Sequence, residues 1–149
     1  MDLLDAIKNH KDYTIENGNE IVKKGEIVAF YFEKHSLYKN YLTPKGIDYK
    51  KILSAKILPD SALLVGDTIF IIEKKYQEGK GSVDEKLQTC DFKMKQYSKL
   101  FSPLNIKVEF YFILSKWFNK PKYNDVFKYI ESVGCKYFIE YLPLKELNL

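Results

Sequence analysis

Two carboxylates and one lysine are spaced so that they could catalyse phosphodiester hydrolysis if the fold brought them together. Asp60 follows Pro59, and the run Glu73-Lys74-Lys75 begins after twelve further residues. Carboxylate oxygens, together with a main-chain carbonyl and water, are ligands suited to Mg²⁺. A bound Mg²⁺ lowers the pKa of a water ligand and stabilises charge on a phosphoryl oxygen. A neighbouring lysine can orient the attacking water and stabilise the charge that develops in the transition state.

The sequence between these residues predicts a β-hairpin. Residues 61–65 form a short apolar run, Gly66-Asp67 is typical of a turn, and residues 68–72 are apolar and largely β-branched. The second strand is apolar on both faces, which indicates a central position in a sheet.

Such a hairpin would gather the chemical groups at one end of the sheet. Asp60 would stand at the start of the first strand, and Glu73 and Lys75 at the end of the second. Residues two apart in a strand point to the same face, so Glu73 and Lys75 should project together. By the same alternation, Lys74 should point away from them.

The remaining sequence predicts an α/β sandwich with a mixed sheet, because helical and strand patterns alternate along the chain. Its length of 149 residues fits a single domain over residues 1–149. Expected helices cover residues 2–10, 20–42, 83–101 and 124–133, and further strands cover residues 106–114 and 136–142. The third helix would begin with a capping box formed by Ser82 and Glu85.

The helix expected over residues 20–42 would bring two further carboxylates near each other. Its apolar stripe consists of Ile27, Tyr31, Tyr38 and Leu42, and Pro44 follows its end. Glu26 and Glu33 are seven residues apart, which places them on nearly the same side of a helix.

Pro59-Asp60 followed by Glu73-Lys74-Lys75 resembles the signature of the PD-(D/E)XK nuclease superfamily, and most of all its type II restriction endonucleases. The expected element order also resembles that family's core, over roughly residues 20–142. The resemblance implies a restriction-endonuclease-like three-layer sandwich, with a central mixed sheet flanked by helices in an αβββαβ-type core. It further implies a metal-dependent endodeoxyribonuclease that uses Mg²⁺, with Mn²⁺ as a substitute.

The resemblance also assigns roles to individual residues. It makes Asp60 and Glu73 the metal ligands and Lys75 the catalytic lysine. Gln77 lies on the same strand face, where several family members have a glutamine near the scissile phosphate. Many members add a carboxylate from the preceding helix, and either Glu33 or Glu26 could take that role.

A second group of residues is expected to contact nucleic acid. Residues 81–86 resemble the loop that leads into the helix after the motif in some restriction enzymes, which makes Ser82 and Lys86, together with the preceding Lys80, candidate DNA contacts. A helix N-terminus can hold a phosphate, although a plain capped turn explains the same pattern. Phe92 falls opposite the core stripe of this helix, where it could pack at a dimer interface or against DNA.

Composition narrows the class of protein without identifying a partner. Hydrophobic residues make up 46% and charged residues 30% of the chain, which excludes intrinsic disorder. No apolar run approaches the ~20 residues that span a bilayer, and the N-terminus lacks a signal-peptide pattern. Cys90 and Cys135 are expected to be small core residues of a cytoplasmic protein. All 24 basic residues are lysine and the net charge is +4, which permits an anionic partner such as DNA.

Several functions are compatible with these patterns. The expected one is a sequence-specific restriction enzyme that cuts double-stranded DNA as a homodimer, because one active site cuts one strand. A structure-selective nuclease, such as a Holliday-junction resolvase, would have the same site. The other possibilities are a DNA-binding module without chemistry and a subunit of a heteromeric nuclease.

Overall fold

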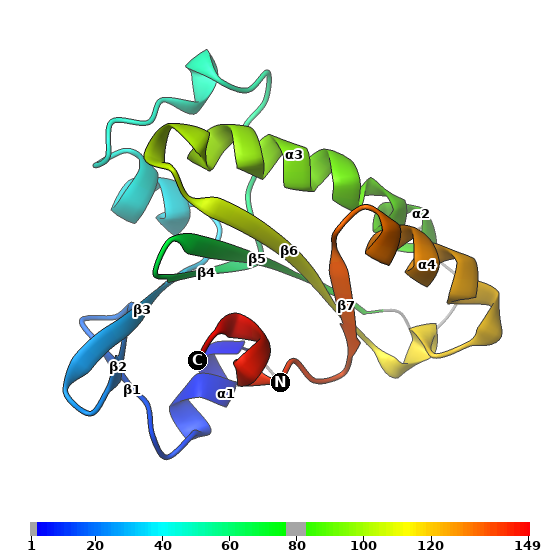
Figure 1. Cartoon of the computed structure of the whole chain (residues 1–149), viewed down its shortest axis with the longest axis horizontal. Coiled ribbons are helices and arrows are strands. Elements are labelled where there is room, and N and C mark those ends of the chain that lie inside the picture. The colour runs from blue at the N-terminus through cyan, green and yellow to red at the C-terminus, as the bar shows by residue number, and fades with distance from the viewer. Residues whose placement is uncertain (1–2, 77–82) are drawn as a thin grey trace.

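A seven-stranded mixed sheet forms the centre of the molecule in a computed structural model that describes residues 3–76 and 83–149 (Figure 1). The strands lie side by side in chain order, from β1 at one edge to β7 at the other. Their bounds are β1 Thr14–Glu16, β2 Glu20–Lys23, β3 Glu26–Phe32, β4 Ser61–Val65, β5 Thr68–Lys75, β6 Lys107–Leu114 and β7 Lys136–Ile139. The predicted α/β class with a mixed sheet is therefore confirmed.

The pairing of neighbouring strands changes from antiparallel to parallel at β5. Strands β1 to β5 pair antiparallel, whereas β5, β6 and β7 pair parallel. Parallel neighbours need a crossover connection, and helices supply it here. Helix α2 (Val83–Lys86) and helix α3 (Cys90–Phe101) connect β5 to β6, and helix α4 (Asn124–Ser132) connects β6 to β7.

The helix expected over residues 20–42 is wrong. The segment folds as β2 and β3, followed by a π-helical turn at Tyr38–Leu42. Lys24 and Gly25 adopt positive φ angles of 52° and 79° between the two strands, a conformation suited to a tight hairpin turn. The β-branched and aromatic residues on either side then pair across the hairpin, so sheet pairing decides the structure rather than the helical spacing of the apolar residues.

The predicted hairpin of residues 61–72 is confirmed as β4 and β5. Ser61 lies opposite Ile72, Val65 lies opposite Thr68, and Gly66 in the turn has a positive φ of 59°. Strand β5 lies between β4 and β6, and residues 69–73 are all buried. Its predicted central position is therefore also confirmed.

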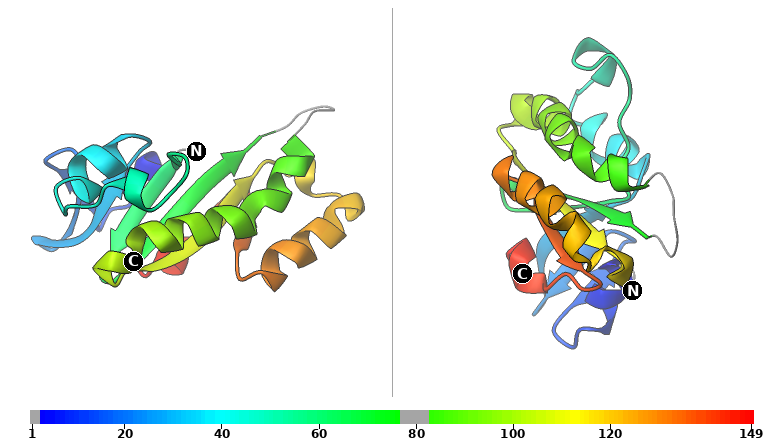
Figure 2. Two further views of the ribbon diagram at one scale, coloured as in Figure 1. Left: turned by 90° about the horizontal axis from the view of Figure 1, so that it is seen from above. Right: turned by 90° about the vertical axis from the view of Figure 1, so that its right-hand side faces the viewer.

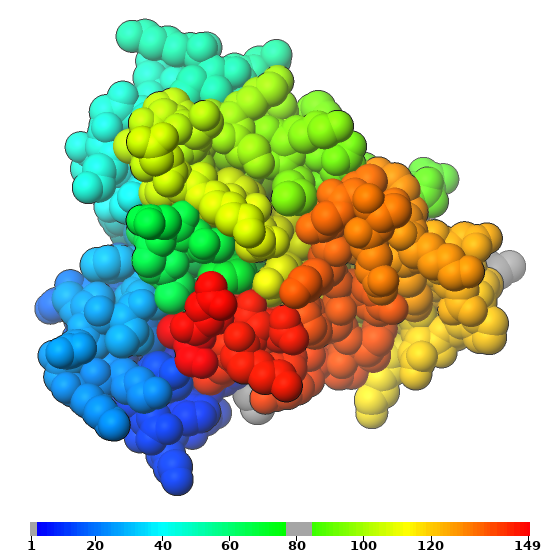
Figure 3. Space-filling model, viewed as in Figure 1, coloured from blue at the N-terminus to red at the C-terminus, as the bar shows by residue number. Residues whose placement is uncertain are grey.

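Two hydrophobic layers cover the two faces of the sheet (Figure 2). Ile69 and Ile71 of β5 pack with residues of α3 and α4, whereas Phe70 and Ile72 pack on the other face. That second face is covered by helix α1 (Leu3–Asn9) and by the C-terminal segment. Figure 3 shows the C-terminal residues (red) lying against the N-terminal segment (blue) and the segment that leads from β7 (orange).

The other predicted elements differ from the observed ones mainly at their ends. Helix α1 occupies most of residues 2–10, and α4, β6 and β7 lie within the predicted ranges. The helix predicted for residues 83–101 is interrupted by a 3₁₀ turn at Leu87–Thr89. Ser82, the predicted cap, lies outside the described residues.

The core predictions on single residues also hold. Cys90 and Cys135 are both buried and form no disulfide. Phe92 is 65% exposed on the outer face of α3. Within the described part of the chain, no helix has the length and apolar character needed to cross a membrane.

Candidate active site

Asp60 and Glu73 lie beside each other in the hairpin register, where β4 begins and β5 ends. Ser61 pairs with Ile72, so Asp60, the residue before β4, lies beside the last residues of β5. The backbone N–H of Lys74 donates a hydrogen bond of 2.9 Å to Oδ2 of Asp60. The carboxylate of Asp60 is therefore held against the residue next to Glu73, as the predicted hairpin requires.

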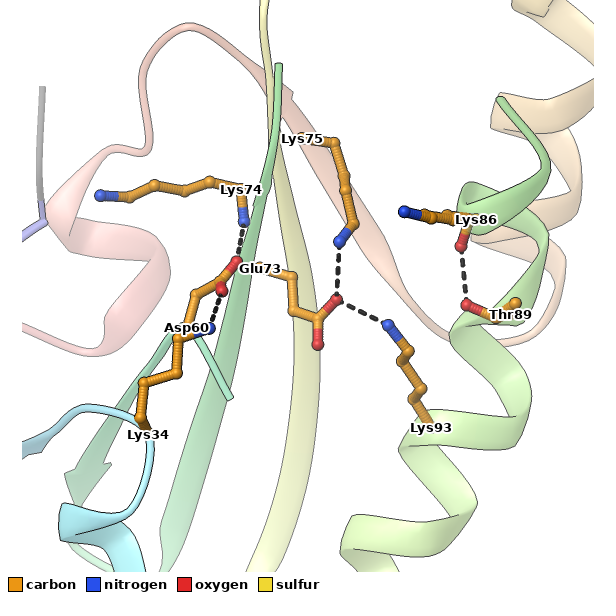
Figure 4. A network of polar contacts seen from close by, with 8 residues as sticks. All are labelled: Lys34, Asp60, Glu73, Lys74, Lys75, Lys86, Thr89 and Lys93. Atoms are coloured by element: carbon orange, nitrogen blue, oxygen red, sulfur yellow. Dashed lines mark hydrogen bonds and ion pairs between the residues drawn. The ribbon is translucent and has the colours of Figure 1, made fainter. Parts of the chain in front are cut away.

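Glu73 is a buried carboxylate between two lysines. Its side chain is 6% exposed, and its Oε2 lies 2.9 Å from Nζ of Lys93 and 3.5 Å from Nζ of Lys75 (Figure 4). Lys75 comes from the same strand face, as strand alternation predicts, and Lys93 comes from the covering helix α3. Burying a carboxylate is costly unless it is paired, and these two ammonium groups supply the pairing.

Asp60 is also held by positive charge. Nζ of Lys34 donates a hydrogen bond of 2.5 Å to its Oδ1, from the loop after β3. Burial acts to raise the pKa of Asp60, but it is outweighed by the hydrogen bonds from Lys34 and from the Lys74 backbone and by the charges of Lys34 and Lys75. The net effect lowers the pKa of Asp60 below its usual value, so the carboxylate is ionised and able to bind a cation at neutral pH.

Lys74 lies on the opposite face of β5 from Glu73 and Lys75. Figure 4 shows its side chain extending away from the Glu73 carboxylate, while its backbone N–H contacts Asp60. The register predicted from strand alternation is therefore confirmed.

Two residues of this cluster, Lys34 and Lys93, were not found from sequence. Lys93 is three residues after Cys90 and four before Tyr97, so it falls on the buried side of α3. A lysine at a core position of an amphipathic helix is the signal that could have identified it. Lys34 has a positive φ of 46°, and its N–H bonds to Pro59, a long-range contact with no local sequence signal.

Neither Glu33 nor Glu26 lies on a helix, which corrects the prediction that one of them joins the site from a helix. Glu33 follows β3, and its Oε1 accepts a hydrogen bond of 2.6 Å from the hydroxyl of Tyr31. Tyr31 belongs to the core on the face opposite α3. Glu26 begins β3 and pairs with Lys23, at the end of that strand remote from Asp60. The structure therefore brings neither carboxylate together with Asp60 and Glu73.

Only one of the remaining predicted residues can be placed. Gln77, Lys80 and Ser82 lie outside the described residues. Lys86 is exposed at the end of α2, and its carbonyl accepts a hydrogen bond from the Thr89 hydroxyl at 2.7 Å. Figure 4 shows its side chain directed toward the end of β5, which is compatible with the predicted contact to a nucleic acid at that end of the sheet.

Further lysines follow β6 at the same end of the sheet. The N–H of Ser115 bonds to the carbonyl of Lys75 at 3.1 Å, so the loop after β6 starts beside the site. Lys116 and Lys122 in this loop are exposed, and Nζ of Lys120 lies 3.1 Å from the centre of the Trp117 ring. The segment therefore carries cationic and aromatic groups side by side.

The oxygen ligands fit a small divalent cation better than a transition metal. Among the described residues, no three His, Cys, Asp or Glu side chains come together as a possible metal cluster. Mg²⁺ does not require such a cluster, because it retains several water ligands and is commonly held by one or two carboxylates. Asp60 and Glu73 supply two carboxylates from neighbouring strands, and Lys75 stands on the same face.

Comparisons with models of protein families, with curated proteins and with solved structures found no match to this chain. The site must therefore be interpreted from its own geometry. That geometry consists of two carboxylates at the ends of adjacent strands, one lysine on the same strand face and a second lysine from the covering helix.

Proposed function

We propose that this protein is a metal-dependent endodeoxyribonuclease that hydrolyses phosphodiester bonds of double-stranded DNA. One observation carries the proposal: Asp60, Glu73 and Lys75 lie together at the end of β5, an interior strand of the mixed sheet. The same residues carry the sequence resemblance to the PD-(D/E)XK nucleases. Within that class, we propose a sequence-specific restriction enzyme with a restriction-endonuclease-like sandwich fold.

Each residue of the site has a specific task in this reaction. Asp60 and Glu73 would hold Mg²⁺ or Mn²⁺, which supplies an activated water and stabilises charge on the phosphate oxygens. Lys75 orients the attacking water toward phosphorus and stabilises the negative charge that develops on the phosphoryl oxygens. The water oxygen forms the new bond to phosphorus, and the bond from phosphorus to one sugar oxygen breaks.

DNA is supported as substrate by the lysines around this end of the sheet. Lys86, Lys116 and Lys122 are all exposed; Lys86 is directed toward the end of β5, Lys116 follows Ser115, which bonds to Lys75, and Lys122 lies further along the same segment after β6. Lysines that neutralise phosphates contribute most of the sequence-independent affinity for DNA. Cleavage of both strands requires two active sites, so we propose that the protein acts as a homodimer.

The direct test is digestion of plasmid DNA with the purified protein and Mg²⁺, followed by sequencing of the ends. A restriction enzyme is expected to give discrete fragments whose ends share one sequence and one cut position. A synthetic four-way junction is digested in parallel, because a junction resolvase would cut it and leave the plasmid without discrete products. A protein that binds DNA and cuts neither substrate would contradict the proposed activity and indicate a binding module.

The lysines after β6 give a prediction for binding alone. Replacing Lys116 and Lys122 by glutamine should weaken DNA binding for all sequences alike. The slope of log affinity against log salt should fall by about 0.9 for each phosphate contact that is lost. Fluorescence anisotropy at several salt concentrations measures both quantities. Lys8→Gln, in α1 on the opposite face of the sheet, is the matched control and should leave the slope unchanged.

A further inference from the structure

Tyr97 of α3 has a buried hydroxyl group that the site described so far does not use. The side chain is fully buried, and its hydroxyl has no hydrogen-bond partner among the residues that the structure describes. Two other core tyrosines differ, since the hydroxyl of Tyr38 donates to the carbonyl of Ile57 and that of Tyr111 to the carbonyl of Glu146. A buried polar group without a partner is destabilising, which indicates a partner other than the described residues, such as a bound water.

Helix geometry directs this hydroxyl toward the carboxylates. Tyr97 lies one turn after Lys93, and long side chains on a helix lean toward its N-terminus, where Lys93 contacts Glu73. The Tyr97 ring centre is 6.5 Å from that of Phe110, which pairs with Ile71, two residues before Glu73 on the same strand face. The ring thus packs on the strand face that carries Glu73, and the expected lean of the side chain directs its hydroxyl toward the end of the strand where Glu73 lies.

The direction in which the pKa of Tyr97 is shifted agrees with a hydroxyl on the side of the carboxylates. Burial is the largest cause that raises the pKa of Tyr97, and the negative charge of Glu73, the neighbouring Tyr38 and the charge of Asp60 raise it further. The group stays protonated, so it can donate a hydrogen bond to an oxygen atom near the two carboxylates.

We propose that Tyr97 is a positioning residue of the cation site. Its hydroxyl donates a hydrogen bond to a water molecule that lies between the carboxylates of Asp60 and Glu73 and forms part of the hydration of the bound cation. This inference rests on the proposed function, because it assumes a divalent cation at those carboxylates. It adds a second residue of helix α3, after Lys93, to the groups that orient the two carboxylates.

The substitution Tyr97→Phe removes only the hydroxyl and keeps the ring that packs on Phe110. Partners that orient metal ligands typically change metal affinity by about 10- to 100-fold when they are removed. We therefore expect Tyr97→Phe to weaken Mn²⁺ binding, measured by electron paramagnetic resonance, by about 10-fold or more. The melting temperature in excess chelator should be unchanged or higher, because an unpaired buried hydroxyl is lost. Added Mn²⁺ should then raise the melting temperature less than in the wild type.

Tyr111→Phe is the matched control, since it removes a paired hydroxyl on the opposite face of the sheet. It should lower the melting temperature and leave Mn²⁺ affinity unchanged. Equal Mn²⁺ affinity in wild type and Tyr97→Phe would overturn the role of Tyr97 and leave the proposed function standing. A lower melting temperature of Tyr97→Phe in chelator, with unchanged affinity, would also overturn it by indicating a structural partner. Failure of the wild type itself to bind Mn²⁺ would refute the cation site and this inference together.

Discussion

Lys75→Ala should nearly abolish DNA cleavage while DNA affinity stays within a few-fold of the wild type. The ammonium group of Lys75 lies 3.5 Å from Glu73 on the strand face that carries the site. Its charge is needed mainly in the transition state, where negative charge develops. Loss of the ammonium group should therefore lower the rate of the chemical step rather than the affinity for DNA. Removing one such stabilising group typically lowers kcat by about 10²- to 10³-fold. Single-turnover cleavage and equilibrium binding in Ca²⁺ measure the two effects separately.

Lys74→Ala is the internal control for this experiment. Its side chain extends from the other face of β5, and the backbone N–H that binds Asp60 is retained in alanine. Cleavage should change much less than in Lys75→Ala, provided that both variants keep the wild-type melting temperature. If folded Lys74→Ala loses activity while Lys75→Ala keeps it, the assignment of the catalytic lysine is wrong. If both folded variants cut normally, the site itself is wrong.

Cleavage should be absent in excess chelator and return with Mg²⁺ or Mn²⁺, whereas Ca²⁺ should support binding without efficient cutting. The reason is the hard oxygen donor set of Asp60 and Glu73.

Asp60→Asn keeps the shape of the side chain and removes its charge, so cation affinity and cleavage should both fall, cleavage by about 10²-fold or more. Metal-free DNA binding should become tighter, because a negative charge close to the DNA phosphates is removed. Calorimetric titration with Mn²⁺ and a gel assay measure these outcomes.

Glu33→Gln provides the matched carboxylate control. Glu33 accepts its hydrogen bond from Tyr31, whose ring packs on the face opposite α3. We expect the glutamine variant to retain cation affinity and cleavage, since its amide oxygen can still accept from the Tyr31 hydroxyl. Loss of cation binding in Glu33→Gln would restore the original sequence-based prediction that Glu33 joins the site. Full cleavage by the wild type in excess chelator would instead refute the metal-dependent reaction.

The centre of the candidate site could be predicted because its signals are local. The Gly66-Asp67 turn and the apolar runs beside it define the hairpin, and the register of that hairpin alone brings Asp60 next to the end of β5. Strand alternation then places Glu73 and Lys75 on one face and Lys74 on the other. No long-range information is needed for any of these steps.

The rest of the site depends on contacts between distant segments. Lys93 reaches Glu73 only because α3 packs across the sheet, and Lys34 reaches Asp60 only because the loop after β3 turns toward Pro59. The error in residues 20–42 has a related cause, since the apolar residues there fit a helical stripe as well as a strand. Pairing with β4 resolves that ambiguity, and such pairing cannot be read from spacing within the segment.

The change from antiparallel to parallel pairing at β5 also affects the order in which the parts of the candidate site form during folding. The β4–β5 hairpin closes through the short turn at Gly66-Asp67, whereas pairing β5 with β6 requires the whole segment between Lys75 and Lys107 to fold back. Asp60 and Glu73 belong to the hairpin, but Lys93 belongs to the crossover that joins the two halves. During synthesis, a ribosome-bound chain that has folded only its hairpins thus presents carboxylates without the helix that encloses them. A fully enclosed site is therefore a property of the completed sheet, and partly made chains lack it.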